Sequence, residues 1–283
     1  MRKNITITGG LGYIGTELCK IYSGESWYNK IKVIDNRFIS KRVSQLRNWN
    51  IEFIQGDILD KQFMKKQIED ADIIHHLAGI TNVAYVKTDS NAKHDELIKD
   101  TAIKGTQNIL DFTKKDCKII FPSTHVVFEG LQESKRNLTE EDKTETFLSY
   151  SSSKVINEEQ IKKSGLKYII LRLGSVYGYS TDTMRINIMP NLFSKITSQN
   201  EKIKLFSGGK QIKTLAPLLD VARCFKFMEE NYKIESGIYN LAKDSVTVKE
   251  VAEICKKINP KVSIKMTQDE IPNLGYTLSN KKI

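Results

Sequence analysis

Two segments of the chain carry side chains that could transfer protons. The stretch FPSTHVVFEG has adjacent hydroxyls at Ser123 and Thr124, and the later stretch YSSSK has Tyr150 and Lys154. On a helix, residues four positions apart share one face, so Lys154 would lie near the Tyr150 phenol. A nearby cation favours the phenolate and lowers the tyrosine pKa. Tyr150 could then accept a proton from a hydroxyl group while Thr124 hydrogen-bonds the same oxygen.

The YxxxK spacing is not selective by itself, because the chain contains it three times. Tyr28 comes before the second predicted strand, too early to reach the same site, and Tyr239 falls in the C-terminal part. Tyr150 begins a predicted helix that follows the strand ending at Thr124. This context selects Tyr150 and Lys154 as the reactive pair.

The segment TGGLGYIG lies between a predicted strand and a predicted helix, where a dinucleotide-binding loop belongs. Glycines at these spacings permit a tight turn, a close approach of the backbone to a pyrophosphate, and close packing of the helix on the sheet. The N-terminus of the helix supplies unpaired N–H groups for the phosphates. The residues expected to contact a dinucleotide here are Gly9, Gly12, Tyr13, Ile14 and Gly15.

An acidic residue stands where the ribose of that dinucleotide would lie. Asp35 ends the second predicted strand, twenty residues after Gly15, and a carboxylate at this position accepts hydrogen bonds from the ribose hydroxyls. The same carboxylate repels a 2′-phosphate, so the pattern favours NAD over NADP. Arg37 and Arg42 follow closely and would weaken that preference.

Two further segments end predicted strands with residues suited to the same ligand. GDI after the third strand brings Asp57 toward the adenine ring, and HLAGIT after the fourth contains small residues that let the backbone approach the cofactor. His75 and His76, inside the fourth strand, are interpreted as packed core residues. The other residues assigned to the cofactor are Asn36, Asp57, Ile58, Leu77, Ala78, Gly79, Ser123, Tyr150 and Lys154.

The elements that would carry these residues alternate short apolar runs with longer mixed segments, as in βαβ units with a parallel sheet. Strands are predicted at 4–10, 30–36, 51–57, 71–79, 117–124 and 166–178. Helices are predicted at 13–24, 95–115 and 150–165. This order predicts an α/β, doubly wound Rossmann fold, which binds its ligands at the carboxyl ends of the strands.

The pattern of apolar and polar segments changes after residue 178. Short apolar pieces alternate with polar loops, and one amphipathic helix is predicted at 248–258. We interpret residues 1–176 as an NAD-binding Rossmann domain and residues 177–283 as a smaller substrate-binding lid domain. The second domain is expected to be discontinuous, with a segment that returns to the Rossmann sheet.

The bulk composition disfavours several other classes of protein. Among 283 residues, 40% are hydrophobic and 28% charged, and no apolar run is long enough for a membrane span. The first strand begins too early to leave room for a signal peptide. The four separated cysteines form no CxxC pair and no metal site, which is typical of a protein in the reducing cytoplasm. The net charge of +10 comes from scattered lysines, so nucleic-acid binding is disfavoured.

Taken together, the motifs resemble a known family. TGGLGYIG, GDI, HLAG, KGTQNIL, STHVVF, YSSSK, LRLGSVYG and GIYNLA occur in the order typical of the extended short-chain dehydrogenases/reductases, in their nucleotide-sugar epimerase/dehydratase branch. The resemblance covers nearly the whole chain. It implies a tightly held NAD, a nucleoside-diphosphate sugar as substrate, and a catalytic triad of Thr124, Tyr150 and Lys154.

The resemblance also implies substrate-binding positions at Thr81, Ser175 and Lys213, and a homodimer formed through the helices at 95–115 and 150–164. Ser175 stands where relatives usually have an asparagine. Lys213 stands where relatives often have an arginine that binds the diphosphate. Lysine has the same charge but cannot donate the two parallel hydrogen bonds of a guanidinium.

The residues after Thr124 depart from part of the family. Its 4,6-dehydratases follow their catalytic threonine with acidic residues that drive water elimination, whereas this chain has His125 and Val126. STHVVFEG also resembles a stretch of the 4-keto-sugar reductases, which release their cofactor at each turnover. His125 could act as a second acid or base, but strand alternation points it away from Thr124 and favours a packed role.

The leading hypothesis is an NAD-dependent nucleotide-sugar epimerase. Tyr150 removes a proton, the hydride passes to NAD, and after the 4-keto intermediate turns over the hydride returns to its other face. The first alternative is a reductase or dehydratase that uses the same triad. The second is a non-catalytic protein that senses NAD. The sugar and the nucleotide base are left open.

Overall fold

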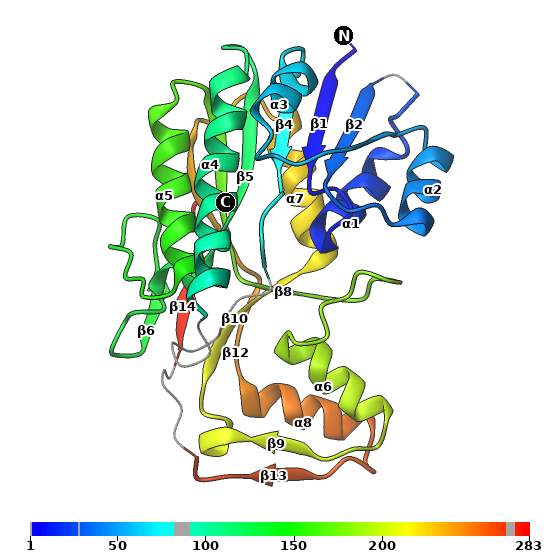
Figure 1. Ribbon diagram of the computed structural model, residues 1–283. Helices are drawn as coiled ribbons and strands as arrows, with labels where there is room; N and C mark the ends of the chain where they lie inside the picture. The colour runs from blue at the N-terminus through cyan, green and yellow to red at the C-terminus, as the bar shows by residue number, and fades with distance from the viewer. Residues whose placement is uncertain (1, 28, 82–90, 270–274) are drawn as a thin grey trace.

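The computed structural model describes residues 2–27, 29–81, 91–269 and 275–283. At its centre is a seven-stranded parallel sheet in the order β11-β7-β5-β4-β1-β2-β3 (Figure 1). The strands are β1 (Asn4–Thr8), β2 (Lys30–Asp35), β3 (Glu52–Gln55), β4 (Ile73–His76), β5 (Lys118–Thr124), β7 (Lys167–Leu173) and β11 (Gly237–Leu241). The strand order reverses at β1, which is the arrangement of a doubly wound fold. The predicted fold class is therefore confirmed.

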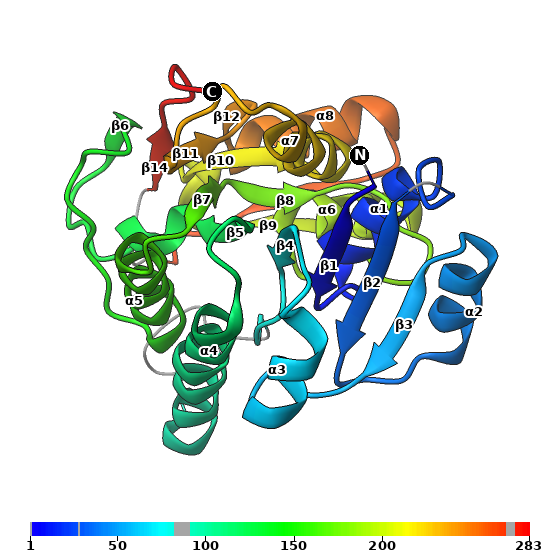
Figure 2. The same ribbon diagram turned by 90° about the horizontal axis from the view of Figure 1, so that it is seen from above.

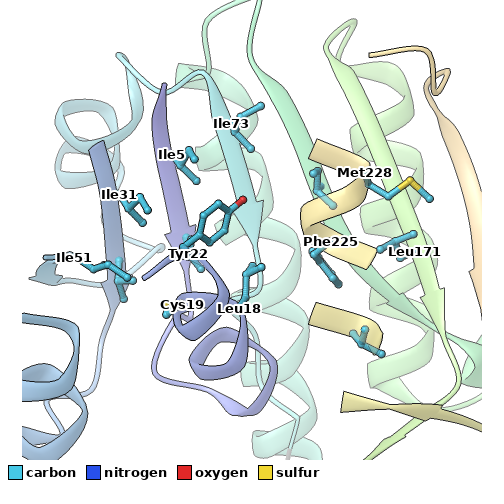
Figure 3. Packing of buried hydrophobic residues seen from close by; sticks show 14 of the residues in the cluster. Ile5, Leu18, Cys19, Tyr22, Ile31, Ile51, Ile73, Leu171, Phe225 and Met228 are labelled. Carbon is cyan, nitrogen blue, oxygen red and sulfur yellow. The ribbon is translucent and has the colours of Figure 1, made fainter. Parts of the chain in front are cut away.

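Helices cover both faces of this sheet (Figure 2). One face carries α1 (Tyr13–Tyr22), α2 (Ser40–Asn48) and α7 (Leu218–Glu230), and the other carries α3 (Lys61–Ile68), α4 (Ala92–Phe112) and α5 (Ser149–Lys163). Figure 3 shows Leu18 and Tyr22 of α1 and Phe225 of α7 in the buried cluster that also contains Ile5 of the sheet. The strands are rich in buried isoleucine and valine because both of their faces are covered. No helix in the described ranges is long and apolar enough to span a membrane.

A smaller group of elements lies beyond the carboxyl ends of the parallel strands (Figure 1). It contains a three-stranded sheet of β8 (Ser175–Tyr177), β10 (Ile212–Pro217) and β12 (Asp244–Thr247). It also contains the strand pair β9 (Ile203–Leu205) and β13 (Ile264–Met266), with α6 (Met189–Ser198) and α8 (Val248–Ile258) packed beside it. A further strand pair, β6 (Lys135–Leu138) with β14 (Tyr276–Leu278), lies near α5. The loops that follow β1, β4 and β5 therefore face the smaller group.

Three details differ from the sequence predictions. The strand expected at 166–178 is divided at Gly174 into β7, which pairs in the main sheet, and β8, which pairs with β10 in the smaller sheet. The described part of 177–283 contains three helices, α6, α7 and α8, where one was expected. Tyr239 lies in β11 of the main sheet rather than in a lid. Tyr28, another of the three YxxxK tyrosines, lies outside the described residues.

A buried ion pair fixes the helix that carries Tyr150 to the sheet. Arg172 of β7 donates to both carboxylate oxygens of Glu158 on α5, at 3.0 Å from Nε and 2.8 Å from Nη2. Ser123 of β5 donates its hydroxyl to the same carboxylate at 2.5 Å. Arg172 is 4% exposed and Glu158 is 2% exposed. Because two strands and one helix meet at a single carboxylate, this contact sets the position of α5 on the sheet.

Replacing Glu158 with alanine is expected to lower the free energy of unfolding by about 3–5 kcal/mol, since the Arg172 guanidinium would be left buried without its partner. Chemical denaturation followed by circular dichroism measures this change. Glu159→Ala is the matched control, because Glu159 lies on the exposed face of the same helix and pairs with Lys162. Its effect should stay within about 0.5 kcal/mol. Equal stability of the two variants would contradict the anchoring role.

Candidate active site

A cavity of about 1470 Å³ lies at the carboxyl ends of the parallel strands, between the main sheet and the smaller group of elements. All residues that the sequence predicted for cofactor, catalysis and substrate lie in its wall. They are Gly9, Gly12, Tyr13, Ile14, Gly15, Asp35, Asn36, Asp57, Ile58, Leu77, Ala78, Gly79, Thr81, Ser123, Thr124, Tyr150, Lys154, Ser175 and Lys213. Their convergence is observed, and their individual roles stay predictions.

The loop between β1 and α1 is shaped for close backbone contact. Gly9 has a φ of +70°, a left-handed conformation that favours glycine, and a Cβ there would lie 2.7 Å from the Cα of Ala78. At Gly15 a Cβ would lie 2.6 Å from the carbonyl oxygen of Gly9. No side chain caps α1 at Gly12, so the N–H groups of its first turn are open to an anion in the cavity. These features fit the pyrophosphate of a dinucleotide.

Asp35 ends β2 beside this loop, and its carboxylate already has partners. It accepts the backbone N–H groups of Leu11 and Arg37, each at 3.1 Å. The Arg37 guanidinium donates to both carboxylate oxygens at 3.0 and 3.1 Å, and this hydrogen bonding raises the pKa of Arg37. Arg42 instead binds Asp182 and the Leu11 carbonyl oxygen. A ribose that reached Asp35 would therefore have to share it with Arg37 or displace that side chain.

The other predicted adenine-side residues form a small hydrogen-bonded unit. Asn36 Nδ2 donates to Asp57 Oδ2 at 3.3 Å, and the backbone N–H of Leu59 donates to Asp57 Oδ1 at 2.9 Å. These contacts hold the Asp57 carboxylate in the cavity wall beside Ile58. The carboxylate is thus positioned by its own loop before any ligand binds.

The two histidines of β4 are packed core residues, as the sequence predicted. His76 lies between the Thr8 hydroxyl at 2.8 Å and the Thr106 hydroxyl at 3.0 Å. His75 contacts the Tyr22 hydroxyl at 2.6 Å. Burial lowers the pKa of His75 to about 4 and that of His76 to about 3, so both rings are neutral at physiological pH.

Thr124, Tyr150 and Lys154 come together in the cavity wall. The Thr124 side chain lies near enough to the Tyr150 phenol to lower its pKa. The Lys154 Nζ lies 5.9 Å from the centroid of the Tyr150 ring and 4.2 Å from that of Phe121. It donates to the Pro122 carbonyl oxygen at 2.8 Å. The predicted i, i+4 arrangement is therefore present, and β5 contacts both of its members.

The charges of this pair differ from the expectation. Burial raises the pKa of Tyr150, and this effect outweighs the Arg185 charge and the Thr124 side chain, which both lower it. Burial lowers the pKa of Lys154 to about 7, although attraction to Glu158 opposes the change. The expected lowering of the Tyr150 pKa by Lys154 is wrong for this arrangement, because the ammonium is desolvated and donates to a backbone carbonyl rather than to the phenol.

His125 lies in the cavity wall, and the strand-alternation argument about it is wrong. β5 ends at Thr124, and the chain then forms a short 3₁₀ helix, η2 (His125–Phe128), so strand alternation no longer applies. The His125 Nε2 lies 3.1 Å from the Ser175 hydroxyl, and its ring packs against Tyr276. Burial, followed by the charge of Lys213, lowers the pKa of His125 to about 3. The imidazole is therefore neutral.

The remaining predicted positions offer different groups to a ligand. The Ser123 hydroxyl is bound to Glu158 inside the protein, so it already has a partner away from the cavity. Lys213 lies in the wall of the smaller group, and burial lowers the pKa of its ammonium. The Thr81 carbonyl oxygen accepts from Arg185 Nη2 at 3.0 Å.

Sequence reasoning missed several polar cavity residues, among them Glu129, Arg185 and Tyr276. Glu129 raises the pKa of Tyr150 while Arg185 lowers it, so both act on the predicted catalytic group. Glu129 stands inside the stretch FPSTHVVFEG, where an acid five residues after Thr124 was a detectable signal. Arg185 and Tyr276 lie in segments without a motif, and their sequence neighbours do not indicate a site.

Comparisons with known proteins agree with this geometry. The model of the NAD dependent epimerase/dehydratase family matches residues 5–242. A dTDP-D-glucose 4,6-dehydratase of Dictyostelium discoideum is 27% identical over 264 residues, and the match covers 86% of this chain but only 58% of that relative. A UDP-glucose 4-epimerase of Mycoplasma genitalium is 24% identical over 285 residues, which cover 91% of this chain and 82% of the relative.

Among solved structures, a UDP-glucuronic acid 4-epimerase of Bacillus cereus, in complex with UDP-glucuronic acid and NAD, has the same fold. Its TM-score is 0.82 at 22% identity, and the match covers 99% of this chain and 91% of that chain. The family match begins in β1 and ends just after β11, so it includes the glycine loop, Thr124, Tyr150 and Lys154. This chain belongs to the NAD-dependent epimerase/dehydratase family of the extended short-chain dehydrogenases/reductases.

Proposed function

We propose that this protein is a nucleotide-sugar epimerase that retains NAD and works through a 4-keto sugar. The observation that carries the proposal is that Thr124, Tyr150 and Lys154 lie in the wall of the same cavity as the glycine loop. A sugar hydroxyl that reached Thr124 and Tyr150 would contact a proton acceptor and a hydrogen-bonding partner at once. The Mycoplasma genitalium relative, named as a UDP-glucose 4-epimerase, supports this assignment.

The chain's own groups fit the cofactor. The glycine loop and the first turn of α1 would hold the pyrophosphate, and Asp35 would accept the ribose hydroxyls once Arg37 moves aside. Lys154 could turn from the Pro122 carbonyl to a ribose hydroxyl. When bound, NAD supplies a ring that accepts a hydride and returns it.

Tyr150 is the proposed proton acceptor. The O–H and C–H bonds at one sugar carbon break, the proton goes to Tyr150, and departure of the hydride leaves a 4-keto sugar. Return of the hydride to the opposite face and of the proton to the oxygen gives the epimer without net oxidation. Because burial keeps the phenol protonated in this structure, the reaction needs positive charge nearby, which Arg185 supplies.

The residues after Thr124 favour epimerisation over dehydration. Water elimination needs an acid, and the two positions in question hold a neutral histidine and a valine. With a pKa of about 3, His125 would be charged only far below physiological pH. We assign it a hydrogen-bonding role with Ser175 at the sugar end of the cavity.

A 4-keto-sugar reductase is the second candidate. The Arg37 guanidinium covers the Asp35 carboxylate, which reduces the repulsion of a 2′-phosphate and so weakens the bias against NADPH. A reductase would use the same triad but would consume its cofactor. An NAD sensor without catalysis is a third possibility, which the intact Thr124, Tyr150 and Lys154 set disfavours.

We extend the proposal to the remaining features predicted for the protein. Lys213 would bind the diphosphate of a nucleoside-diphosphate sugar, because its ammonium faces the cavity from the smaller group. The protein would work in the cytoplasm as a homodimer through α4 and α5, where Leu97 and Ile156 are 50% and 42% exposed. In this proposal, residues 1–176 form the NAD-binding domain and residues 177–283 form the substrate-binding domain.

The epimerase proposal is tested by incubating the purified protein with UDP-, dTDP- and GDP-sugars. We expect an epimer detected by proton NMR, no net absorbance change at 340 nm, and NAD in the supernatant after the protein is denatured. Stoichiometric loss of NADPH absorbance would identify a reductase instead. Failure to turn over any sugar, with NAD still bound, would favour the sensor.

Tyr150→Phe is expected to lower kcat by roughly 10²- to 10⁴-fold, the usual contribution of a general acid–base group, while bound NAD stays constant. Steady-state kinetics and the nucleotide content of the purified variant measure the two effects. Tyr239→Phe is the control, because this second YxxxK tyrosine lies in β11 and donates to the Glu235 carbonyl oxygen. Wild-type activity in the Tyr150 variant would rule out the triad.

The stability cost of Lys154 should depend on pH. Its pKa is about 7 in the folded chain, below its ordinary value of 10.5, so the folded state binds fewer protons than the unfolded state between these values. Stability therefore rises with pH across this window, and the penalty is fully present below pH 7. In nucleotide-free protein, the Tm gain of Lys154→Met over the wild type should shrink from pH 7 to pH 10. Lys162→Met, at an exposed position, should show no such trend, and a pH-independent gain at position 154 would refute the depressed pKa.

A further inference from the structure

Glu129 is a cavity-wall carboxylate that the triad leaves without a role. Its Oε1 accepts the backbone N–H of Leu148 at 2.9 Å and that of Phe147 at 3.4 Å. The same oxygen accepts the Ser151 hydroxyl in a short hydrogen bond. One carboxylate oxygen thus binds residues on both sides of Tyr150.

The backbone around Glu129 reinforces this link. The N–H of Gly130 donates to the Glu145 carbonyl oxygen at 2.8 Å, and the N–H of Glu145 donates to the Val127 carbonyl oxygen at 2.9 Å. These bonds join the turn after Thr124 to the segment that leads into α5. The chain between residues 130 and 145 therefore forms a loop that is closed at its base.

The N-terminus of α5 needs such a contact. Its N-cap residue, Leu148, has no side chain that could accept a hydrogen bond, and the first turn contains no acidic residue. A carboxylate near a helix N-terminus is favoured both by the unpaired N–H groups and by the helix dipole. Glu129, the residue directly after η2, supplies that carboxylate from a different part of the chain.

We propose that Glu129 is a positioning residue that ties the first turn of α5 to the turn after β5 and thereby sets the Tyr150 hydroxyl opposite Thr124. Thr124 ends β5 and Tyr150 lies in α5, and no other side chain of the described residues is shown bonding both flanks of Tyr150. The effect on turnover rests on the proposed function, whereas the effect on the position of the Tyr150 hydroxyl does not.

The charge of Glu129 also acts on the pKa of Tyr150, which gives a second way to test the contact. The groups that act on the Tyr150 phenol are Arg185 and the Thr124 side chain, which lower its pKa, and Glu129, which raises it. The ammonium of Lys154 lies 5.9 Å from the ring centroid. Removing the Glu129 charge while keeping an oxygen acceptor should therefore lower the Tyr150 pKa, because the Arg185 charge remains.

The experiment compares Glu129→Gln with Glu129→Ala. Glutamine keeps an oxygen for the Leu148 and Ser151 contacts but has no charge, and alanine removes both. Protein labelled with ¹³C at the tyrosine ζ-carbon reports the Tyr150 signal by NMR, assigned with Tyr150→Phe. We expect the Tyr150 titration to move to lower pH in the glutamine variant. In the alanine variant we expect the chemical shift itself to change, since the first turn loses its anchor.

Kinetics with whichever sugar the wild type converts provide the second readout. Glu129→Ala should lower kcat on the order of 100-fold, the effect of a misplaced reacting group, with a smaller change in KM. Glu129→Gln should recover most of that loss and shift the acidic limb of the pH–rate profile to lower pH. Glu159→Gln, on the exposed face of α5, is the matched control and should leave every readout unchanged.

A Tyr150 chemical shift identical in the wild type and in a folded Glu129→Ala variant would overturn the proposal. If the alanine variant fails to fold, an unchanged Tyr150 titration in Glu129→Gln would overturn it instead, because Glu129 would then not act near the phenol. If the wild type converts no sugar, the proposed function fails, yet a changed Tyr150 chemical shift in Glu129→Ala would still support the positioning role alone.

Discussion

The buried ion pair between Glu158 and Arg172 holds α5 on the central sheet, and the reacting side chains depend on that contact. Moving two charges out of water is costly, so such a pair persists only when its geometry is good and its remaining hydrogen-bonding atoms have partners. Here the fork of Arg172 meets both carboxylate oxygens, and Ser123 adds a third donor. The contact joins β5, β7 and α5 at one point. Thr124 ends the first of these elements and Tyr150 lies near the start of the last.

Burial surrounds the Glu158–Arg172 pair, and burial also disfavours the phenolate of Tyr150 and the ammonium of Lys154, the charged forms that the proposed reaction needs. Burial holds Tyr150 protonated, brings the pKa of Lys154 to about 7 and keeps His125 neutral. In such a cavity, the Tyr150 phenol can lose its proton only if the charges around it offset the cost of burying the phenolate. Arg185 and Glu129 contribute opposite signs to that balance. Under the proposed function, the choice between epimerisation and elimination would depend on which charged groups surround the phenol, as much as on the proposed triad itself.

The cofactor side of the cavity follows a different principle, because its key groups belong to the backbone. Glycines at positions 9 and 15 leave room that a Cβ would fill, and α1 begins without a side-chain cap. Such a surface fits the pyrophosphate of the proposed assignment. Asp35 is the exception, since Arg37 already occupies its carboxylate. Under the proposed function, selectivity between NAD and NADPH would therefore depend on the half-exposed Arg37 side chain more than on the loop.

The sequence by itself determined what depends on near neighbours in the chain. Alternating apolar runs located the main strands, glycine spacing located the loop after β1, and a spacing of four residues paired Tyr150 with Lys154. The tertiary structure decided what depends on distant segments: which segment of the C-terminal part joins the main sheet, namely β11, the turn of His125 into the cavity, and the approach of Arg185 and Tyr276. It also decided the pKa directions, because burial is a property of the assembled core. Local patterns encode periodicity and turn geometry, whereas contacts and desolvation arise only when remote residues are packed together.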